Sequence, residues 1–381
     1  MVKAAYIHIP FCEQICHYCD FNKVFLRRQP VDDYIEALLL EIERTFFRHH
    51  SDAIKTVYIG GGTPTALSLK QLEKLLKGLT NVFPIERVEE FTIEVNPDNI
   101  DDEKLSVLKT YGVNRLSVGV QTFDDELLRE IGRTHSKASI LDALERCSKR
   151  FDNISIDLMF ALPKQTVLHF ENSLNEALSL PITHVSAYAL QLEAKTVFYN
   201  RYKKGELVLP SDDEAAAMYE LLRSKMSAAG FMHYEISNFA KRGYESKHNL
   251  VYWNNEEYFG FGAGAHGYVG RVRYENYHPV KKYIQALFRN ERPVLRDHVV
   301  SEWESIEEAI FLGLRKVSGI DKEDFFRRYG RRLEQLFPQQ LNKLKEAGLL
   351  YVDDEVIRLT EEGLLLGNEV FAEFIGVFAD D

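Results

Sequence analysis

The sequence predicts an α/β protein: a partial (βα)6 TIM-like barrel followed by a smaller C-terminal α+β domain that resembles a winged helix. Two observations predict it. Over the first two-thirds of the 381 residues, short apolar runs rich in β-branched residues alternate with amphipathic stretches of helical period. Near the end of the chain, helical patterns precede a short hairpin pattern. Repeated strand–helix alternation favours a parallel sheet with right-handed crossovers, and six units are too few for the closed eight-stranded barrel.

Each strand of the predicted barrel is a short run bounded by helical or turn-forming residues. The runs cover residues 4–9, 56–59, 90–95, 115–120, 155–159 and 185–190. The clearest helix between them, residues 32–47, carries apolar side chains at helical spacing. A second helix begins after Ser68, which forms a capping-box pattern with Gln71. In such barrels the chemistry gathers at the C-terminal ends of the strands.

The rest of the chain changes character after residue 190. We predict a helix over residues 212–229, then a loop rich in aromatic, glycine and histidine residues over 233–277. Helices at 301–317 and 333–347, a hairpin of 350–352 with 356–359, and a last helix at 360–374 complete the predicted tail. The predicted division is a barrel at 1–235, an aromatic and glycine-rich connecting region at 236–292, and a C-terminal domain at 293–381.

Charge and cysteine distribution narrow the functional class. The net charge of −11 argues against a general nucleic-acid binder, which needs a basic footprint. No apolar run reaches the roughly 18 residues of a membrane span, and the chain opens on a strand-like segment rather than a signal peptide, so we expect a cytoplasmic protein without an integral membrane segment. Three of the four cysteines fall within eight residues, which indicates a reducing compartment and a metal site. The fourth, Cys147, lies in a helical pattern and is expected to be buried.

The three clustered cysteines are Cys12, Cys16 and Cys19, directly after the first predicted strand. Three thiolates can bind three corners of a [4Fe–4S] cubane and leave the fourth iron open, whereas an electron-carrying cluster normally has four cysteines. Zinc is the competing metal, because His17 could complete a Cys₃His set. Structural zinc usually uses two well-separated C-x-x-C pairs, and there is no second pair. The pattern therefore favours the cluster.

This C-x-x-x-C-x-x-C spacing after a first strand resembles the signature of the radical S-adenosylmethionine (radical SAM) family. The fuller string Tyr6-Ile-His-Ile-Pro-Phe-Cys12 is similar to the coproporphyrinogen dehydrogenase (HemN) family and its relatives, the HemW haem chaperones. The string at residues 359–371 resembles the C-terminal region of these proteins. The resemblance implies that S-adenosylmethionine chelates the open iron. One electron from the reduced cluster would then cleave its sulfonium C–S bond and yield a 5′-deoxyadenosyl radical.

Polar and glycine residues at the strand ends are candidates for binding that cofactor. Three glycines before Thr63 let the backbone approach a ligand closely, although a simple turn is the alternative. Glu94 and Gln121 end strands, and Asp157 interrupts an apolar one, where a charge is costly unless it is paired. Satisfied structural groups are the alternative for each. The resemblance implies that Gly61, Gly62 and Thr63 hold the methionyl part, that Glu94, Gln121, Arg133 and Asp157 contact the amino acid and ribose parts, and that Tyr6 and Tyr18 lie close to the cofactor.

Two departures bear on the substrate. Enzymes of the HemN type carry another cysteine two residues after the third one, where this chain has Phe21, and they extend further before the barrel. Both departures disfavour an oxygen-independent coproporphyrinogen III oxidase. That enzyme and a related radical SAM methyltransferase remain the alternatives.

The string His248-Asn249-Leu-Val-Tyr252-Trp253 resembles the haem-binding signature of the HemW group. Imidazole is a common haem-iron ligand, and Tyr and Trp offer flat faces to a macrocycle. A structural histidine is the alternative, and His266 is a weaker second candidate. Cations that would meet the haem propionates, or simply form a solvated face, are Lys241, Arg242, Lys247, Arg271 and Arg273. The sequence thus predicts a haem chaperone that passes haem to an acceptor protein; whether it dimerises stays open, and so does whether it catalyses turnover.

Overall fold

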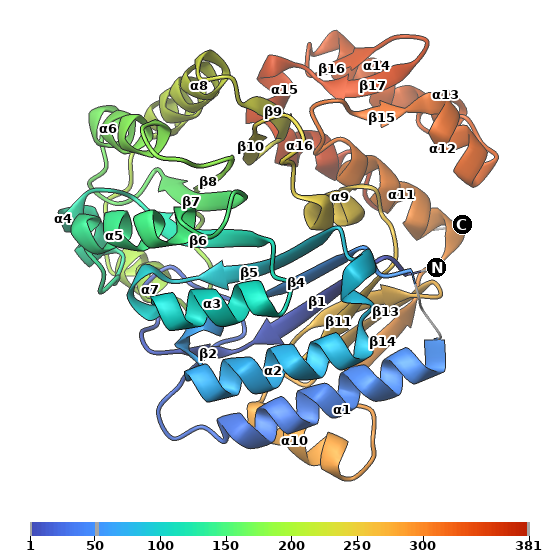
Figure 1. Ribbon diagram of the computed structural model, residues 1–381. Helices are drawn as coiled ribbons and strands as arrows, with labels where there is room; N and C mark the ends of the chain where they lie inside the picture. Colours follow the sequence, from blue (N-terminus) through green and yellow to red (C-terminus); the bar gives the residue numbers. More distant parts are fainter. Residues whose placement is uncertain (1, 50–52, 379–381) are drawn as a thin grey trace.

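A computed structural model describes residues 2–49 and 53–378 of the chain (Figure 1). A sheet of twelve strands, ordered β14-β13-β12-β11-β1-β4-β5-β6-β7-β8-β10-β9, runs through the molecule. Its six central strands are parallel neighbours. They are β1 (Ala4–Ile9), β4 (Thr56–Gly61), β5 (Glu90–Val95), β6 (Arg115–Gln121), β7 (Ile154–Phe160) and β8 (His184–Ala189). The predicted partial barrel is confirmed, with each strand within two residues of its predicted bounds.

Helices cover the outer side of these strands, as Figure 1 shows. The helices of the barrel are α1 (Val31–His49), α2 (Leu69–Val82), α3 (Asp102–Thr110), α4 (Asp125–Glu130), α5 (Lys137–Ser148), α6 (Val167–Leu178), α7 (Val197–Lys203) and α8 (Asp212–Ala228), with short 3-10 turns at Pro64–Ala66, Ile85–Arg87 and Pro97–Asn99. Helix α2 begins with the predicted capping box, because Ser68 and Gln71 each satisfy the other's backbone N–H. Cys147 is fully buried in α5, as expected.

The segment 233–277 is not the loop that the sequence suggested. It contains β10 (Asn238–Ala240), α9 (Lys247–Trp253), β11 (Tyr258–Phe261), β12 (His266–Val269) and β13 (Val272–Asn276), with β9 (Met232–Glu235) at its start and α10 (Val280–Phe288) and β14 (Val294–Val299) after it. These strands extend the sheet at both edges, and β11 pairs in parallel with β1. The strands within the segment have only three to five residues, too few to display a period of two.

A C-terminal module follows, shown in orange and red in Figure 1. Its elements are α11 (Glu302–Gly313), β15 (Ile320–Asp321), α12 (Lys322–Tyr329), α13 (Leu333–Leu336), α14 (Pro338–Glu346), β16 (Leu350–Val352), β17 (Val356–Leu359), α15 (Glu361–Leu365) and α16 (Gly367–Ala372). The hairpin lies where predicted, and β15 joins it in a three-stranded sheet. Two predicted helices are each split in two. Pro338 starts α14 because its ring lacks an N–H and suits a first helical turn, and Leu366 separates α15 from α16.

The two ends of the barrel differ. The cysteine segment leaves β1 at the C-terminal ends of the strands, whereas α9 lies across their N-terminal ends, between the barrel and α11 (Figure 1). Within residues 2–49 and 53–378, no helix is long and apolar enough to cross a membrane.

Candidate functional site

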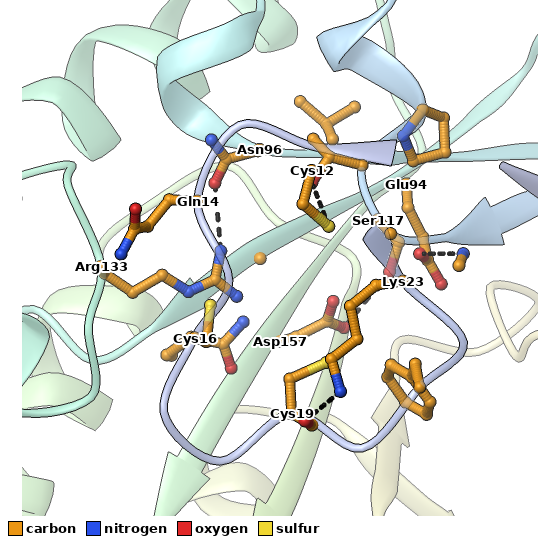
Figure 2. Close-up of a pocket in the computed structure, with 18 of the residues that line it drawn as sticks. Cys12, Gln14, Cys16, Cys19, Lys23, Glu94, Asn96, Ser117, Arg133 and Asp157 are labelled. Carbon is orange, nitrogen blue, oxygen red and sulfur yellow. Dashed lines mark hydrogen bonds between the residues drawn. The ribbon is translucent and has the colours of Figure 1, made fainter. Parts of the chain in front are cut away.

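The three clustered cysteines lie on a loop that is closed by a small parallel pair. Strand β2 (Phe11–Cys12) pairs with β3 (Val24–Phe25), and the Leu26 N–H donates to the Cys12 carbonyl at 2.8 Å. Residues 12–25, the cysteine loop, therefore start and end at the same place. Figure 2 shows the sulfur atoms of Cys12, Cys16 and Cys19 around one space, and all three residues line the same cavity. None of them forms a disulfide.

His17 points away from that cavity. Its Nδ1 is 2.8 Å from the carbonyl oxygen of Glu130, and its N–H donates to the Ile131 carbonyl at 3.0 Å. The ring also packs edge-on against Phe198 of α7, with 5.8 Å between centroids. The imidazole thus anchors the cysteine loop to the end of α4. A Cys₃His zinc set would need His17 among the cavity residues, and it is absent from the described lining.

The cavity of about 360 Å³ opens at the C-terminal ends of the barrel strands. Of the nine residues predicted to surround S-adenosylmethionine, eight line it: Tyr18, Gly61, Gly62, Thr63, Glu94, Gln121, Arg133 and Asp157. Tyr6 does not. Its hydroxyl lies 3.0 Å from His8 Nδ1, and its ring stacks at 6.0 Å on Tyr58, which lines the cavity instead.

Residues 60–62, the three glycines at the end of β4, lie against the cysteine loop. Gly61 has a φ of +118°, which side-chain-bearing residues rarely adopt. A Cβ on Gly62 would lie 2.9 Å from Cys12 Sγ. Glycine at both positions lets the end of β4 lie directly against the cysteine loop, where the Thr63 hydroxyl reaches Cys12 Sγ at 3.6 Å.

Two partly buried carboxylates stand on one side of the cavity. Glu94 accepts hydrogen bonds from the Tyr58 hydroxyl at 2.9 Å and the Gly61 N–H at 3.0 Å. Burial, and then the nearby Asp157, raise the pKa of Glu94 to about 7. Burial also raises the pKa of Asp157, which accepts from the Ser117 hydroxyl at 3.2 Å. Such a pair favours a ligand that brings a cation and hydrogen-bond donors.

A buried cation faces the same space. Arg133 donates to Asn96 Oδ1 at 3.1 Å and to the Tyr18 hydroxyl at 3.0 Å, and its Nε has no partner among the described residues (Figure 2). Carboxylates on one side and a guanidinium on the other match the ammonium, hydroxyl and carboxylate groups of S-adenosylmethionine. Burial raises the pKa of the Cys12 thiol to about 11, so binding iron there releases protons. The residues present therefore fit the nucleoside cofactor, and the three thiols that line the same cavity are the donor type that an iron–sulfur cluster uses.

The string at 248–253 forms helix α9, and its side chains diverge. His248 is buried, with Nδ1 at 2.9 Å from Thr56 Oγ1 and Nε2 at 2.8 Å from the Tyr252 hydroxyl. Burial lowers the pKa of this imidazole to about 3. Asn249 lines the cavity from the other end of the barrel. Trp253 packs under the Arg315 guanidinium at 4.5 Å, next to the C-terminal module.

The start of α9 is fixed by the first residue of β5. The Glu90 carboxylate is buried and accepts the backbone N–H of Lys247 at 2.8 Å and of His248 at 3.0 Å. Because Thr56 bonds Nδ1 and Tyr252 bonds Nε2, His248 has no free ring nitrogen in this conformation. The second candidate, His266, is 59% exposed and lies 3.7 Å from Glu275 on the outer part of the sheet.

Several cavity residues escaped the sequence analysis. They are Tyr58, Asn96, Arg115, Ser117, Ser186 and Tyr188. Arg115 starts an apolar strand and is buried, so the reasoning that found Asp157 would have found it too. The neutral residues carried no such signal.

Comparison with known proteins gives the family of the chain. The family model of the radical SAM superfamily matches residues 6–177, and that of the HemN C-terminal domain matches residues 300–366. The fold and the cysteine loop thus define a radical SAM protein, a class whose members use a [4Fe–4S] cluster and S-adenosylmethionine. The solved structure of coproporphyrinogen III oxidase (HemN) from Escherichia coli, a radical SAM enzyme, aligns with a TM-score of 0.83 at 25% identity and covers 98% of this chain and 90% of that one.

Curated relatives refine the class. The heme chaperone HemW of Bacillus subtilis is 53% identical over 377 residues, which is 98% of this chain and 100% of the relative. The heme chaperone HemW of Lactococcus lactis is 46% identical, over 98% of this chain and 97% of the relative. The chain therefore belongs to the HemW heme chaperone family.

Proposed function

We propose that this protein binds haem and transfers it to an acceptor protein, and that a [4Fe–4S] cluster with S-adenosylmethionine supports this transfer. The observation that carries the proposal is the 53% identity to a heme chaperone HemW over 98% of the chain, which spans the cysteine loop, α9 and the C-terminal module. We further propose that it acts in the cytoplasm. Whether it does so as a homodimer is a separate question for solution measurements.

At the cysteine loop, the chain supplies ligands and a shaped cavity. The thiolates of Cys12, Cys16 and Cys19 would hold three irons and leave the fourth to the cofactor. When bound, the cluster and S-adenosylmethionine supply one-electron cleavage of the sulfonium C–S bond. Residues Gly61, Gly62 and Thr63 would lie against the methionyl part; Glu94 and Asp157 would accept hydrogen bonds, and Gln121 and Arg133 would donate them. Tyr18 would orient Arg133, to which it is already hydrogen-bonded. Tyr6 would support Tyr58 from behind the lining.

At α9, His248 would supply the iron ligand and Tyr252 and Trp253 would offer ring faces to the macrocycle. A neutral imidazole suits this role, because the unprotonated nitrogen carries the lone pair that binds iron. Asn249 would contact the cofactor cavity on the other side of the helix. Among the cations proposed for the propionates, Lys247 and Arg273 are held in ion pairs with Glu89 and Glu308 at 2.8 and 2.7 Å.

The second candidate is an oxygen-independent coproporphyrinogen III oxidase, favoured by the TM-score of 0.83 to that enzyme. Phe21 weighs against it. The phenyl ring stands where enzymes of that type carry a further cysteine, and it is 64% exposed at the rim of the cavity.

One pair of assays separates the two functions. The protein is reconstituted anaerobically with iron and sulfide and titrated with haem, and the Soret band is followed. We expect a saturable Soret shift. The reduced, reconstituted protein is then incubated with S-adenosylmethionine and coproporphyrinogen III. We expect no protoporphyrinogen; its formation at catalytic turnover, or the absence of any Soret shift, would overturn the chaperone proposal.

A further inference from the structure

The two ring nitrogens of His248 are held by partners of different kinds. Thr56, on Nδ1, is the buried first residue of β4, and its backbone is fixed between Ala4 of β1 and Glu90 of β5. Tyr252, on Nε2, lies one helical turn further along α9 and is only partly buried. One partner is thus part of the sheet, and the other is a partly exposed side chain of α9 itself, whose hydroxyl can leave by a rotation about its own bonds.

Both partners of the imidazole are hydroxyls, which can donate or accept, so the tautomer depends on which hydroxyl is the stronger donor. A neutral imidazole has one N–H donor and one acceptor nitrogen. A tyrosine hydroxyl donates readily to an unprotonated nitrogen, while a threonine hydroxyl can accept from an N–H. The phenolic hydroxyl of Tyr252 is more acidic than the aliphatic hydroxyl of Thr56 and is the stronger donor, which favours the tautomer with Nε2 accepting from Tyr252 and Nδ1–H donating to Thr56 Oγ1.

We propose that Tyr252 is a displaceable cap on Nε2, the iron-binding nitrogen of His248, and that Thr56 is a positioning residue that keeps this nitrogen unprotonated. The inference rests on the proposed function, because it assumes that haem iron binds His248. Haem then has to break one hydrogen bond at the imidazole, while the bond to Thr56 and the Glu90 contacts keep the ring and α9 in place. Second partners of this kind commonly orient a metal-binding histidine.

The first test needs no haem. Long-range ¹H–¹⁵N NMR spectra of the full-length apoprotein, with histidines labelled and His248 assigned from the His248→Gln variant, report which ring nitrogen is protonated. We expect Nε2 to be unprotonated in the wild type and the tautomer to become mixed in Thr56→Val. A protonated Nε2 in the wild type would overturn the proposal. Thr56→Ser, which keeps a hydroxyl, should restore the wild-type tautomer.

The second test uses haem kinetics. Stopped-flow measurement of the Soret change should show haem associating about 2- to 10-fold faster with Tyr252→Phe, because the lost hydrogen bond is worth about 0.5–1.5 kcal/mol. Thr56→Val should bind haem about 10- to 100-fold more weakly and change the axial-ligand spectrum, and Thr56→Ser should recover both. Tyr111→Phe is the control, because Tyr111 follows α3 and its hydroxyl reaches Glu73 at 3.4 Å, in contact with neither His248 nor α9; it should behave as wild type.

The possible outcomes distinguish the roles of Tyr252 and Thr56 from the proposed haem-binding function. If His248→Ala abolishes iron ligation while Tyr252→Phe and Thr56→Val match the wild type, the cap and positioning roles are wrong and the haem function stands. If the wild type binds no haem, or His248→Ala keeps the wild-type spectrum, both are overturned.

Discussion

The cysteine loop and helix α9 lie at opposite ends of the same strands and are prepared for ligands in opposite ways. The thiols of the cysteine loop face a cavity; the Thr63 hydroxyl donates to Cys12 Sγ at 3.6 Å, and the backbone of Phe21 bonds the Cys19 thiol. On α9, by contrast, His248 has both ring nitrogens bonded and the helix start is held by Glu90. The cysteine loop thus offers a preformed cavity to its ligand, whereas the ring nitrogens of His248 are occupied by hydrogen bonds to Thr56 and Tyr252.

The difference has a thermodynamic meaning. A preformed cavity keeps most of the binding energy of its ligand, because little has to be ordered or displaced. A closed site binds only from the fraction of molecules that are open, so its apparent affinity falls by that fraction. Substitutions in the cysteine loop should therefore change how much iron and sulfide the protein holds. Substitutions in α9 should change the free energy of unfolding and the rate at which haem binds.

The largest expected effect is at the cysteine loop. Cys16→Ala removes one of three cluster ligands, so we expect reconstituted protein to lose nearly all bound iron and sulfide and the visible absorption of the cluster. Cys147→Ala is the matched control, because that thiol is buried in α5 away from the cavity; it should keep wild-type iron content. Full iron content in Cys16→Ala would contradict the assignment.

The next largest effect is at the closed site. His248→Ala deletes a buried ring and two hydrogen bonds, and we expect the free energy of unfolding of the apoprotein to fall by about 2–4 kcal/mol in urea titrations. His266→Ala removes a mostly exposed ring and should change it by less than about 0.5 kcal/mol. Equal effects of the two variants would show that α9 is not closed as described.

Glu90→Gln should loosen α9, whose Asn249 lines the cavity, while leaving the cysteine loop at the other end of the barrel unchanged. The amide keeps one acceptor but turns a donor toward the N–H groups of Lys247 and His248, at a cost of about 1–3 kcal/mol. Hydrogen exchange should speed up over residues 247–253 and stay unchanged in the cysteine loop. The neighbouring Glu89→Gln breaks an exposed ion pair with Lys247 and serves as the control, with an effect near zero. Faster exchange in the cysteine loop of Glu90→Gln would contradict the separation of the two sites.

The smallest effect is a pH dependence at the cavity end of the same strand. Because the pKa of Glu94 is raised to about 7 in the folded apoprotein, the folded state holds this proton more tightly than the unfolded one. Its contribution to stability is complete below about pH 4.5 and is lost as pH rises through about 7. We expect Glu94→Gln to reduce the fall in unfolding free energy between pH 5 and 8 by about 1–2 kcal/mol. If the unfolding free energy of Glu94→Gln fell more steeply with pH than that of the wild type, the raised pKa of Glu94 would be contradicted.

The barrel could be predicted from the sequence because its signals are local. A buried parallel strand is a continuous apolar run, and each of the six strands is long enough to show one. The places of Glu94, Gln121 and Asp157 on the cavity wall followed from position, since strand ends converge at one edge and Asp157 stood out as a charge within an apolar run, whereas Arg133 and Tyr18 came from the family resemblance. Tyr6 was the exception: its backbone position is right, but its side chain turns to His8.

The state of α9 could not be predicted, because it depends on pairing over long sequence separations. The partner of His248 Nδ1 is Thr56, 192 residues earlier, and nothing in the string 248–253 specifies it. The short strands from β10 to β13 were missed for the same reason: their partners lie elsewhere in the chain and their own patterns are too brief. Glu90 did carry a local signal, as a carboxylate at the start of an apolar strand.

Asn249 connects the two ends of the barrel, because it belongs to α9 and also lines the cavity. The residue before it in the same seven-residue helix is His248. Any shift of α9 on binding a ligand therefore also moves one wall of that cavity. If a ligand in the cavity changes the affinity of α9 for haem by some factor, haem on α9 must change the affinity of the cavity for its ligand by the same factor.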